Sequence, residues 1–356
     1  MRPRHRAMEF CDRFGLRLPI LQAPMAGASP PELAIAVAEA GGMGGSGALQ
    51  DSPQRIAEWA REFRAKSSGA FQINIWIPEN SKLDPQERRE RVHTASQFLR
   101  QFGVPPELDE PNQPPVIFSE QCSAMLAAQP TAISSIMGLF PGELVTSMRE
   151  RGIAWFCCAT SLAEAFAAEE AGADAIVAQG MEAGGHRGTF DQDGAERNQV
   201  GLFSLLPRFA DHLRTPIIAT GGIADGRGVA AALSLGASAV QVGTALLRSP
   251  EAGISPEWSD ALNGLAPEDT VTTRAYTGRL ARAAPTPYLA AWTTPDAPRP
   301  APFPDQLSLV TRWRKGNPDG LDKANHWAGQ SAALATTDPA GEIVARMWRD
   351  AKALLT

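Results

Sequence analysis

The feature that most constrains the fold is a repeated alternation of short apolar runs with longer stretches of helical period. Each apolar run ends in Gly or polar residues and is followed by a stretch rich in Ala, Leu, Glu and Arg, as expected for strands that alternate with helices. We expect eight strands, at residues 20–23, 42–46, 70–76, 132–137, 154–158, 175–179, 216–220 and 239–242. We expect helices between them at residues 31–40, 53–66, 85–102, 142–151, 161–171, 202–213 and 226–235. This pattern predicts a parallel sheet of the α/β class, and eight strands are the number of a (β/α)8 TIM barrel.

Two segments depart from the repeat. Residues 77–131 are too long for a single helix, and their Pro- and acid-rich part at residues 104–115 indicates a surface excursion. Residues 248–336 include seven prolines between Pro285 and Pro304, which excludes a regular barrel unit. We therefore expect three parts. They are a barrel domain at residues 1–247, an inserted substrate or lid subdomain at 248–336 whose stretch 270–283 is extended, and a C-terminal helix within 337–356 that returns to the barrel.

Composition and charge restrict the class of ligand. The 356 residues are 44% hydrophobic and 20% charged, which is ordinary globular usage. A net charge of -6 without a Lys/Arg block argues against nucleic acid or an anionic membrane as partner. The basic residues 1–5 precede no apolar run, and no stretch of 18 apolar residues occurs. We expect a soluble, cytoplasmic protein that acts on a small molecule, and a homodimer is left open.

The cysteines do not indicate a metal or disulfide site. None of the four forms a C-x-x-C pair, and the adjacent two lie in an apolar run where neighbouring side chains point to opposite faces. They are Cys11, Cys122, Cys157 and Cys158. We expect all four to be packing residues and no metal to be bound.

Glycines at two neighbouring strand ends predict a phosphate site. They lie in residues 216–228 (PIIATGGIADGRG) and 236–244 (GASAVQVGT), as Gly221-Gly222 and Gly243-Thr244. Glycine lets the backbone approach a ligand because no Cβ intrudes, and the loops after strands seven and eight are the usual phosphate site of barrels. One such pair could merely permit a tight turn, but two favour an anion cradle. The pattern does not say which phosphate compound binds, and no G-x-x-x-x-G-K-[ST] motif supports an ATPase.

Other strand ends offer groups suited to a flat heterocycle. Residues 19–27 (PILQAPMAG) lead into a turn that presents backbone polar groups beside the thioether of Met25, although core packing would also explain this Met. Asn74 lies among apolar residues at the end of the third strand and needs a hydrogen-bond partner, for which a heterocycle edge is one candidate. Gln179, at the end of the sixth strand, could donate to a ring carbonyl.

His186 is the strongest candidate for catalysis. It lies in residues 178–188 (AQGMEAGGHRG), where Gly184 and Gly185 leave room for a cofactor at the barrel mouth. A lone His is more often structural, but this setting favours a general base with a pKa near neutrality. Arg187 could steer an anionic substrate or pair with Glu182, and Glu182 is the weaker acid/base candidate. The remaining histidines are weaker candidates still: His5 in a frayed terminus, His93 and His212 in charged helices, and His326 in the insertion.

These segments together resemble the motif set of the nitronate monooxygenases, formerly called 2-nitropropane dioxygenases. The resemblance rests on residues 22–27 (QAPMAG), 40–44 (AGGMG), 179–186 (QGMEAGGH), 221–226 (GGIADG) and 236–244. It extends from residue 19 to residue 247 and resumes weakly at 276–282 (YTGRLAR) and 327–330 (WAGQ). The resemblance implies an FMN-dependent barrel that oxidises alkyl nitronates, or nitroalkanes, with O2 to carbonyl compounds and nitrite, without nicotinamide or metal.

Carried over by position, the resemblance gives His186 the role of catalytic base. The residues that it implies for FMN binding are Met25, Ala26, Gly27, Asn74, Gln179, Gly184, Gly185, Gly221, Gly222, Gly243 and Thr244. Residues 77–131 and the Pro-rich insertion look atypical of the family. Only two tyrosines, Tyr276 and Tyr288, are available to line a pocket, so the substrate stays open. Three tryptophans of the insertion could cover the flavin or pack elsewhere: Trp292, Trp313 and Trp327.

Three alternatives share these motifs. A flavin-dependent enoyl-acyl-carrier-protein reductase would use a similar barrel and Gly-Gly-His segment but take hydride from NAD(P)H. A flavin-dependent quinone reductase would do the same on this scaffold. A non-catalytic flavin-binding barrel is the third alternative, and the placement of His186 at the mouth argues against it.

Overall fold

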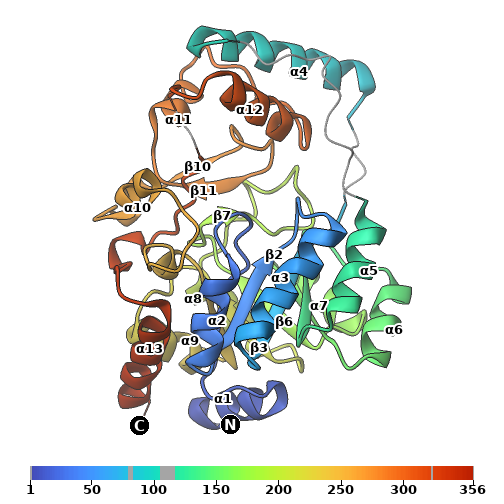
Figure 1. The fold of residues 1–356 in the computed structure, drawn as a ribbon, viewed down its shortest axis with the longest axis vertical. Helices are drawn as coiled ribbons and strands as arrows, with labels where there is room; N and C mark the ends of the chain where they lie inside the picture. Colours follow the sequence, from blue (N-terminus) through green and yellow to red (C-terminus); the bar gives the residue numbers. More distant parts are fainter. Residues whose placement is uncertain (1, 79–82, 105–116, 322–323, 356) are drawn as a thin grey trace.

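The computed structural model describes residues 2–78, 83–104, 117–321 and 324–355. Within these residues, eight parallel strands close into a barrel in the order β1-β2-β3-β4-β5-β6-β8-β9 (Figure 1). The strands are β1 (Ile20–Gln22), β2 (Met43–Gly47), β3 (Ala70–Trp76), β4 (Ala132–Ile136), β5 (Ala154–Ala159), β6 (Ala175–Gln179), β8 (Ile217–Thr220) and β9 (Ala239–Val242). The TIM barrel predicted from the sequence is therefore confirmed, with each strand within two residues of its expected bounds.

Helices form the outer layer of the barrel. They are α2 (Pro31–Glu39), α3 (Pro53–Lys66), α5 (Phe118–Ala128), α6 (Gly142–Glu150), α7 (Leu162–Glu170), α8 (Leu202–Ala210), α9 (Gly226–Ser234) and α13 (Ala340–Leu354). Several begin at a side chain that accepts backbone N–H groups, as Ser52 does for α3, Ser161 for α7 and Asp225 for α9. Helix α5 lies inside the expected excursion and was not predicted. Helix α13 packs against α2 and α9 and fills the eighth helical position.

Successive side chains along each strand point alternately to the helical layer and to the barrel interior. On β3, the Phe71 ring lies 4.7 Å from Phe63 and 5.7 Å from Trp59 of α3, so this face packs on the helices. The next residue, Gln72, points inward, where its amide donates to Gln241 of β9 at 3.0 Å. Because of this alternation, every second side chain of each strand faces the barrel interior, and those at the carboxyl ends of the strands face the barrel mouth.

The bottom of the barrel is closed by α1 (Pro3–Phe14), as Figure 1 shows at the N-terminus. Phe10 and Phe14 of this helix pack on Phe156 of β5, at ring distances of 6.4 and 5.2 Å. The expectation of a frayed terminus around His5 was wrong, because the apolar face of α1 is buried under the strands. Gly15 ends the helix at φ 68°, the left-handed region in which glycine is least strained.

A cap of mixed structure covers the carboxyl ends of the strands (Figure 1). It contains a small antiparallel sheet of order β10-β11-β7. The elements of the cap are β7 (Gly185–His186), α10 (Pro256–Leu262), η3 (Pro267–Asp269), β10 (Val271–Thr273), β11 (Ala281–Ala283), α11 (Pro287–Ala291) and α12 (Asp305–Gly316). Strands β10 and β11 agree with the extended stretch expected at residues 270–283.

Helix α4 (Pro85–Leu99) and the turn η1 (Arg100–Phe102) belong to the same packing unit as the cap. Phe98 and Leu99 share a buried cluster with Tyr288 and Trp313 of the cap. Arg88 of α4 forms a two-point ion pair with Asp305 of α12, at 2.6 and 2.9 Å. The division at residues 247 and 336 stays a prediction, and this packing joins part of the first excursion to the proposed insertion. The excursion expected at residues 104–115 falls, from residue 105 on, outside the described residues.

The cysteines are packing residues, as expected. Cys11, Cys122, Cys157 and Cys158 are free thiols with buried side chains. Burial is the main cause that raises the pKa of Cys11 to about 12 and that of Cys122 to about 11. Among the described helices, none combines the length and the apolar character that a bilayer crossing requires.

Candidate active site

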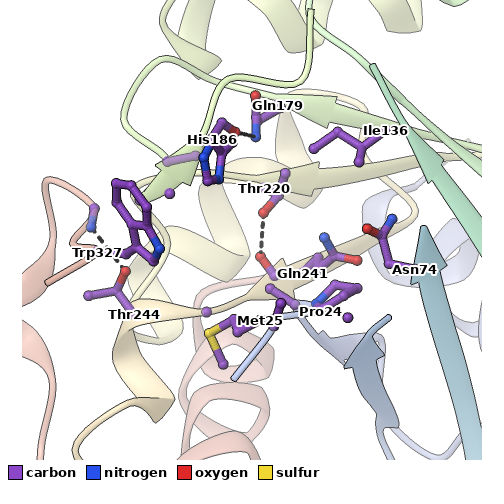
Figure 2. A pocket seen from close by; sticks show the side chains of 18 of the residues that line it. Pro24, Met25, Asn74, Ile136, Gln179, His186, Thr220, Gln241, Thr244 and Trp327 are labelled. Atoms are coloured by element: carbon purple, nitrogen blue, oxygen red, sulfur yellow. Dashed lines mark hydrogen bonds between the residues drawn. The ribbon is translucent and has the colours of Figure 1, made fainter. Parts of the chain in front are cut away.

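A cavity of about 400 Å³ opens at the carboxyl ends of the barrel strands (Figure 2). Its volume falls within the range of about 300–1,000 Å³ that is usual for small-molecule sites. His186 and all the residues implied for FMN binding line it, whereas the weaker acid/base candidate Glu182 does not: the lining candidates are Met25, Ala26, Gly27, Asn74, Gln179, Gly184, Gly185, His186, Gly221, Gly222, Gly243 and Thr244. The barrel thus brings together residues that are more than 200 positions apart in the chain.

The turn after β1 forms one wall of the cavity. Met25 N–H donates to Ser29 Oγ at 3.2 Å, and Gly27 adopts φ 79°. Gly47, after β2, faces this turn closely, since a Cβ there would lie 2.8 Å from the backbone nitrogen of Ala26. The turn is therefore fixed from both sides and holds the Met25 side chain at the cavity wall (Figure 2).

Polar side chains of the inner barrel face reach the floor of the cavity. The Asn74 amide donates to the carbonyl and the hydroxyl of Ser134 at 3.1 and 3.0 Å, so its partner is a neighbouring strand. Among the described residues, no donor reaches the Asn74 side-chain carbonyl, which remains available to a ligand. The Gln241 side-chain carbonyl accepts from Gln72, and the Thr220 hydroxyl donates to the Gln241 backbone carbonyl at 2.9 Å.

Gln179 holds the loop that follows β6. Its amide donates to the His186 carbonyl at 3.0 Å (Figure 2). Its side-chain carbonyl accepts Gly188 N–H at 2.8 Å. Both ends of this amide are therefore engaged within the protein, and at most one N–H is left for a ring carbonyl.

The turn after β8 presents free backbone donors. Gly221 and Gly222 adopt φ 115° and 69°, which turns the chain sharply at the strand end. The N–H groups of Gly222, Ile223 and Ala224 donate to no acceptor among the described residues. These donors are directed by a fixed turn beside the cavity, which is the arrangement that binds anions in backbone nests.

The end of β9 completes this cradle, whereas the start of helix α9 contributes little to it. The Thr244 hydroxyl accepts Gly329 N–H at 3.0 Å, and the Ser331 hydroxyl donates to the Gly222 carbonyl at 2.6 Å. These bonds fasten residues 329–331 across the two strand ends. Asp225 accepts from the first-turn N–H groups of α9 at 3.0 and 3.1 Å, so its carboxylate already neutralises that helix end.

His186 is carried by the cap sheet. It lies in β7, which pairs antiparallel with β11, and Ala281 is its register partner. The imidazole Nε2 lies 2.9 Å from the Thr277 hydroxyl. The ring is flanked by the indoles of Trp76 and Trp327, at centroid distances of 4.5 and 4.8 Å with T-shaped geometry.

This environment keeps the imidazole neutral. Burial, and secondly the Arg279 guanidinium, lower the pKa of His186 to about 3. Arg279 is itself buried and lies over the rings of Phe303 and Trp76, at 4.5 and 5.3 Å. The pKa near neutrality expected from the sequence was wrong, because desolvation and a neighbouring cation both disfavour the imidazolium. At neutral pH the side chain therefore has a lone pair that can accept a proton.

Arg187 and Glu182 have structural partners. The Arg187 guanidinium donates to the carbonyls of Gln179 and Asn198 at 2.7 and 2.8 Å and is buried. The Glu182 carboxylate accepts Leu202 N–H at 2.9 Å, at the start of α8. Neither of the two roles considered for Arg187 is seen, since among its described contacts it neither pairs with Glu182 nor lines the main cavity.

Several wall residues were not predicted. Trp76, Thr277, Gln241 and Ser331 line the cavity and were not named. Trp76 could have been predicted, because it lies two residues after Asn74 on β3 and therefore on the same face of the strand. Trp327 lines the cavity, which agrees with one of the two alternatives given for the tryptophans of the insertion.

The other large aromatics of the cap lie elsewhere. Trp292 and Trp313 are buried in the core of the cap, together with Tyr276 and Tyr288. The two tyrosine rings stack at 5.3 Å, and Tyr276 contacts Trp327 edge-on at 5.3 Å. The tyrosines therefore support the cavity wall from behind and do not line it.

The chain is similar to known proteins over nearly its whole length. A family profile described as nitronate monooxygenase matches residues 9–350. A nitronate monooxygenase of Paraburkholderia phytofirmans is 37% identical over 95% of this chain and 93% of its own length. One from Pseudomonas aeruginosa is 35% identical over 94% of this chain and 97% of its own length.

Two solved structures are also similar over nearly the whole chain. A nitroalkane oxidase from Streptomyces ansochromogenes superposes with a TM-score of 0.86 at 31% identity, covering 98% of this chain and 99% of its own. FabK from Thermotoga maritima superposes with a TM-score of 0.74 at 27% identity, covering 98% and 96%. The profile match and the relatives above 30% identity extend over nearly the whole chain, barrel and cap alike. The chain therefore belongs to the nitronate monooxygenase family, a family of oxidoreductases.

Proposed function

We propose that this protein oxidises alkyl nitronates with O2 to carbonyl compounds and nitrite, using bound FMN, and that His186 lets it also accept neutral nitroalkanes. The observation that carries the proposal is the placement of a neutral imidazole and a glycine-rich anion cradle in one cavity. Family membership supports the reaction class. A cytoplasmic location and a homodimer stay predictions.

The cavity walls fit a flavin mononucleotide. The N–H groups of residues 222–224, which donate to no acceptor in the described part of the chain, suit a phosphate, and the Cβ-free wall at Gly184 and Gly185 suits a flat ring. The residues proposed to hold FMN are Met25, Ala26, Gly27, Asn74, Gln179, Gly184, Gly185, Gly221, Gly222, Gly243 and Thr244. Bound FMN would accept electrons from the substrate and pass them to O2.

His186 supplies the proton chemistry for a neutral nitroalkane. The imidazole takes the proton from the carbon next to the nitro group, and the electrons of that C–H bond move onto the nitro oxygens. An imidazolium is costly in this buried place, but the nitronate anion that forms beside it offsets part of that cost. A substrate that arrives as a nitronate needs no such step, so the two substrate forms separate the role of His186 from the rest of the reaction.

A reductase that uses NAD(P)H is the second candidate. It is one of the alternatives that the sequence motifs left open. The same cradle and the same His would serve either reaction, so the electron donor has to be identified by experiment. A non-catalytic flavin-binding barrel would leave the neutral, cavity-lining His186 without a use.

The test is an anaerobic titration of the FMN-loaded protein, followed by its absorbance spectrum. We expect propionate 3-nitronate to bleach the flavin and NADH to do so only slowly, and we expect nitrite when O2 is admitted. Rapid bleaching by NADH, without any response to the nitronate, would overturn the proposal in favour of a reductase.

A variant separates the role of His186. His186→Asn should keep FMN and the oxidation of nitronates but lose turnover of neutral nitroalkanes by about 100-fold or more. His212→Asn, in an exposed position near the end of α8, is the matched control. Unchanged nitroalkane turnover in His186→Asn would remove this residue from the mechanism.

A further inference from the structure

The Thr277 hydroxyl is within hydrogen-bond distance of the His186 ring. Its oxygen lies 2.9 Å from His186 Nε2, 3.3 Å from the Arg279 backbone nitrogen and 3.4 Å from the Arg279 carbonyl oxygen. Thr277 is only 3% exposed, so solvent does not compete for these contacts. It lies between β10 and β11, in the segment that leads into the register partner of His186.

The surroundings of the imidazole leave one of its nitrogens for the cavity. Nε2 is occupied by Thr277, and the indoles of Trp76 and Trp327 flank the ring. Nδ1 has no hydrogen-bond partner among the described residues, and it is not one of their fully buried, unpartnered atoms. Since His186 lines the cavity, Nδ1 is the nitrogen that can meet a substrate.

Hydrogen-bond counting decides which tautomer the contacts favour. A Thr hydroxyl has one proton to donate and two lone pairs to accept with. If it accepts from His186 Nε2–H and from Arg279 N–H, its own proton points to the Arg279 carbonyl, and the short contact to His186 and both longer contacts to Arg279 are favourable. If it donates to Nε2 instead, two oxygen lone pairs face each other across the 3.4 Å contact.

We propose that Thr277 is a positioning residue that accepts Nε2–H of His186 and thereby keeps the basic lone pair on Nδ1, facing the substrate. This inference rests on the proposed role of His186 as the base. Proton transfer to Nδ1 then needs no change in the hydrogen bond between Nε2–H and the Thr277 hydroxyl. Nδ1 takes the proton from the substrate carbon, the C–H electron pair moves into the nitro group, and the imidazolium still donates Nε2–H to the same oxygen.

The experiment uses FMN-loaded protein labelled with 15N-histidine and two variants of Thr277. Thr277→Val keeps the shape and removes the hydroxyl, whereas Thr277→Ser keeps the hydroxyl. Nitrogen chemical shifts, assigned by the signal lost in His186→Asn, report which ring nitrogen bears the proton. We expect the proton on Nε2 in the wild type and in Thr277→Ser, and a mixture of tautomers in Thr277→Val.

Kinetics give the second readout. Thr277→Val should lower kcat/KM for nitroethane by about 10- to 100-fold and change that for ethyl nitronate by no more than about twofold, and Thr277→Ser should restore nitroethane turnover. A wild-type proton on Nδ1, or equal losses on both substrates in Thr277→Val, would overturn the inference. A wild type that oxidises neither substrate would refute the proposed function instead, while the tautomer measurement would still decide the role of Thr277.

Discussion

Ala281 is the register partner of His186, so the proposed base is attached to the cap sheet while the anion cradle belongs to the barrel. The two halves of the site therefore depend on different cores. The cap core contains Phe98 of α4, Trp292 and the stacked pair Tyr276 and Tyr288. Damage to that core should move the imidazole without removing the phosphate site.

Phe98→Ala tests this dependence. Phe98 is 8% exposed and lies 4.7 Å from the Trp292 ring, so the truncation should cost about 3–5 kcal/mol of stability in the cap. We expect weakened turnover of nitroalkanes, with FMN binding retained, as measured by flavin absorbance and steady-state rates. Phe203→Ala is the control, because Phe203 is 72% exposed and should change stability by less than about 0.5 kcal/mol. Loss of FMN and activity together in Phe98→Ala would argue that cap and barrel unfold as one unit.

The pH dependence of nitroalkane oxidation should differ from that of an exposed histidine. Because burial and Arg279 lower the pKa of His186 to about 3, the neutral base persists well below pH 6.5. We expect kcat/KM for nitroethane to stay flat as the pH falls from about 8 to about 5, and to decline only nearer the lowered pKa. A decline centred near the ordinary histidine pKa would show that the ring is more hydrated in the working enzyme.

Gly184→Ala should disrupt the closure of residues 328–330 over the cavity. A Cβ at Gly184 would lie 2.5 Å from the Gly329 nitrogen and 2.7 Å from the Ala328 carbonyl carbon, and backbone cannot rotate away. We expect a loss of about 1–3 kcal/mol and weaker FMN retention during gel filtration. Gly142→Ala is the matched control, since a Cβ there meets nothing within 4 Å. Equal FMN retention in both variants would mean that this closure does not help to hold the cofactor.

Cys158 should be inert although it lines the cavity. Burial is the first cause that raises its pKa far above the ordinary thiol value, so almost no thiolate exists at neutral pH. We expect iodoacetamide to leave the native protein unmodified at about pH 8, and to alkylate all cysteines in urea, as seen by intact mass spectrometry. Rapid native labelling at Cys158 would show that the barrel interior opens.

The barrel was predictable because its signals are local. Each strand is an apolar run bounded by Gly or polar residues, and the glycines after β8 and β9 mark positions where the chain must turn without a Cβ. The positions that line the cavity followed from the strand ends, since parallel strands converge at one mouth. Helix α1 was missed, although Pro3 at its start, Gly15 at its end and apolar residues at helical spacing indicated it.

The surroundings of His186 could not be predicted in the same way. Its partner Thr277 lies 91 residues away and reaches it through the antiparallel β7–β11 ladder, a pairing that no local pattern specifies. The pKa of His186 is lowered by burial and secondly by Arg279, which lies 93 residues further along the chain, so a local sequence pattern could indicate only the ordinary value. The composition of the cap core, with α4 packed against α12, is likewise a product of tertiary contacts.

The position of α13 has a consequence for how the chain folds during synthesis. Its buried residues Ile343, Val344, Met347 and Trp348 occupy the seam between the first and last barrel units, because α13 packs on both α2 and α9. We therefore expect the surfaces of α2 and α9 that α13 covers to stay exposed until residues 340–354 have been synthesised. A chaperone that shields apolar surface would be most useful during that interval.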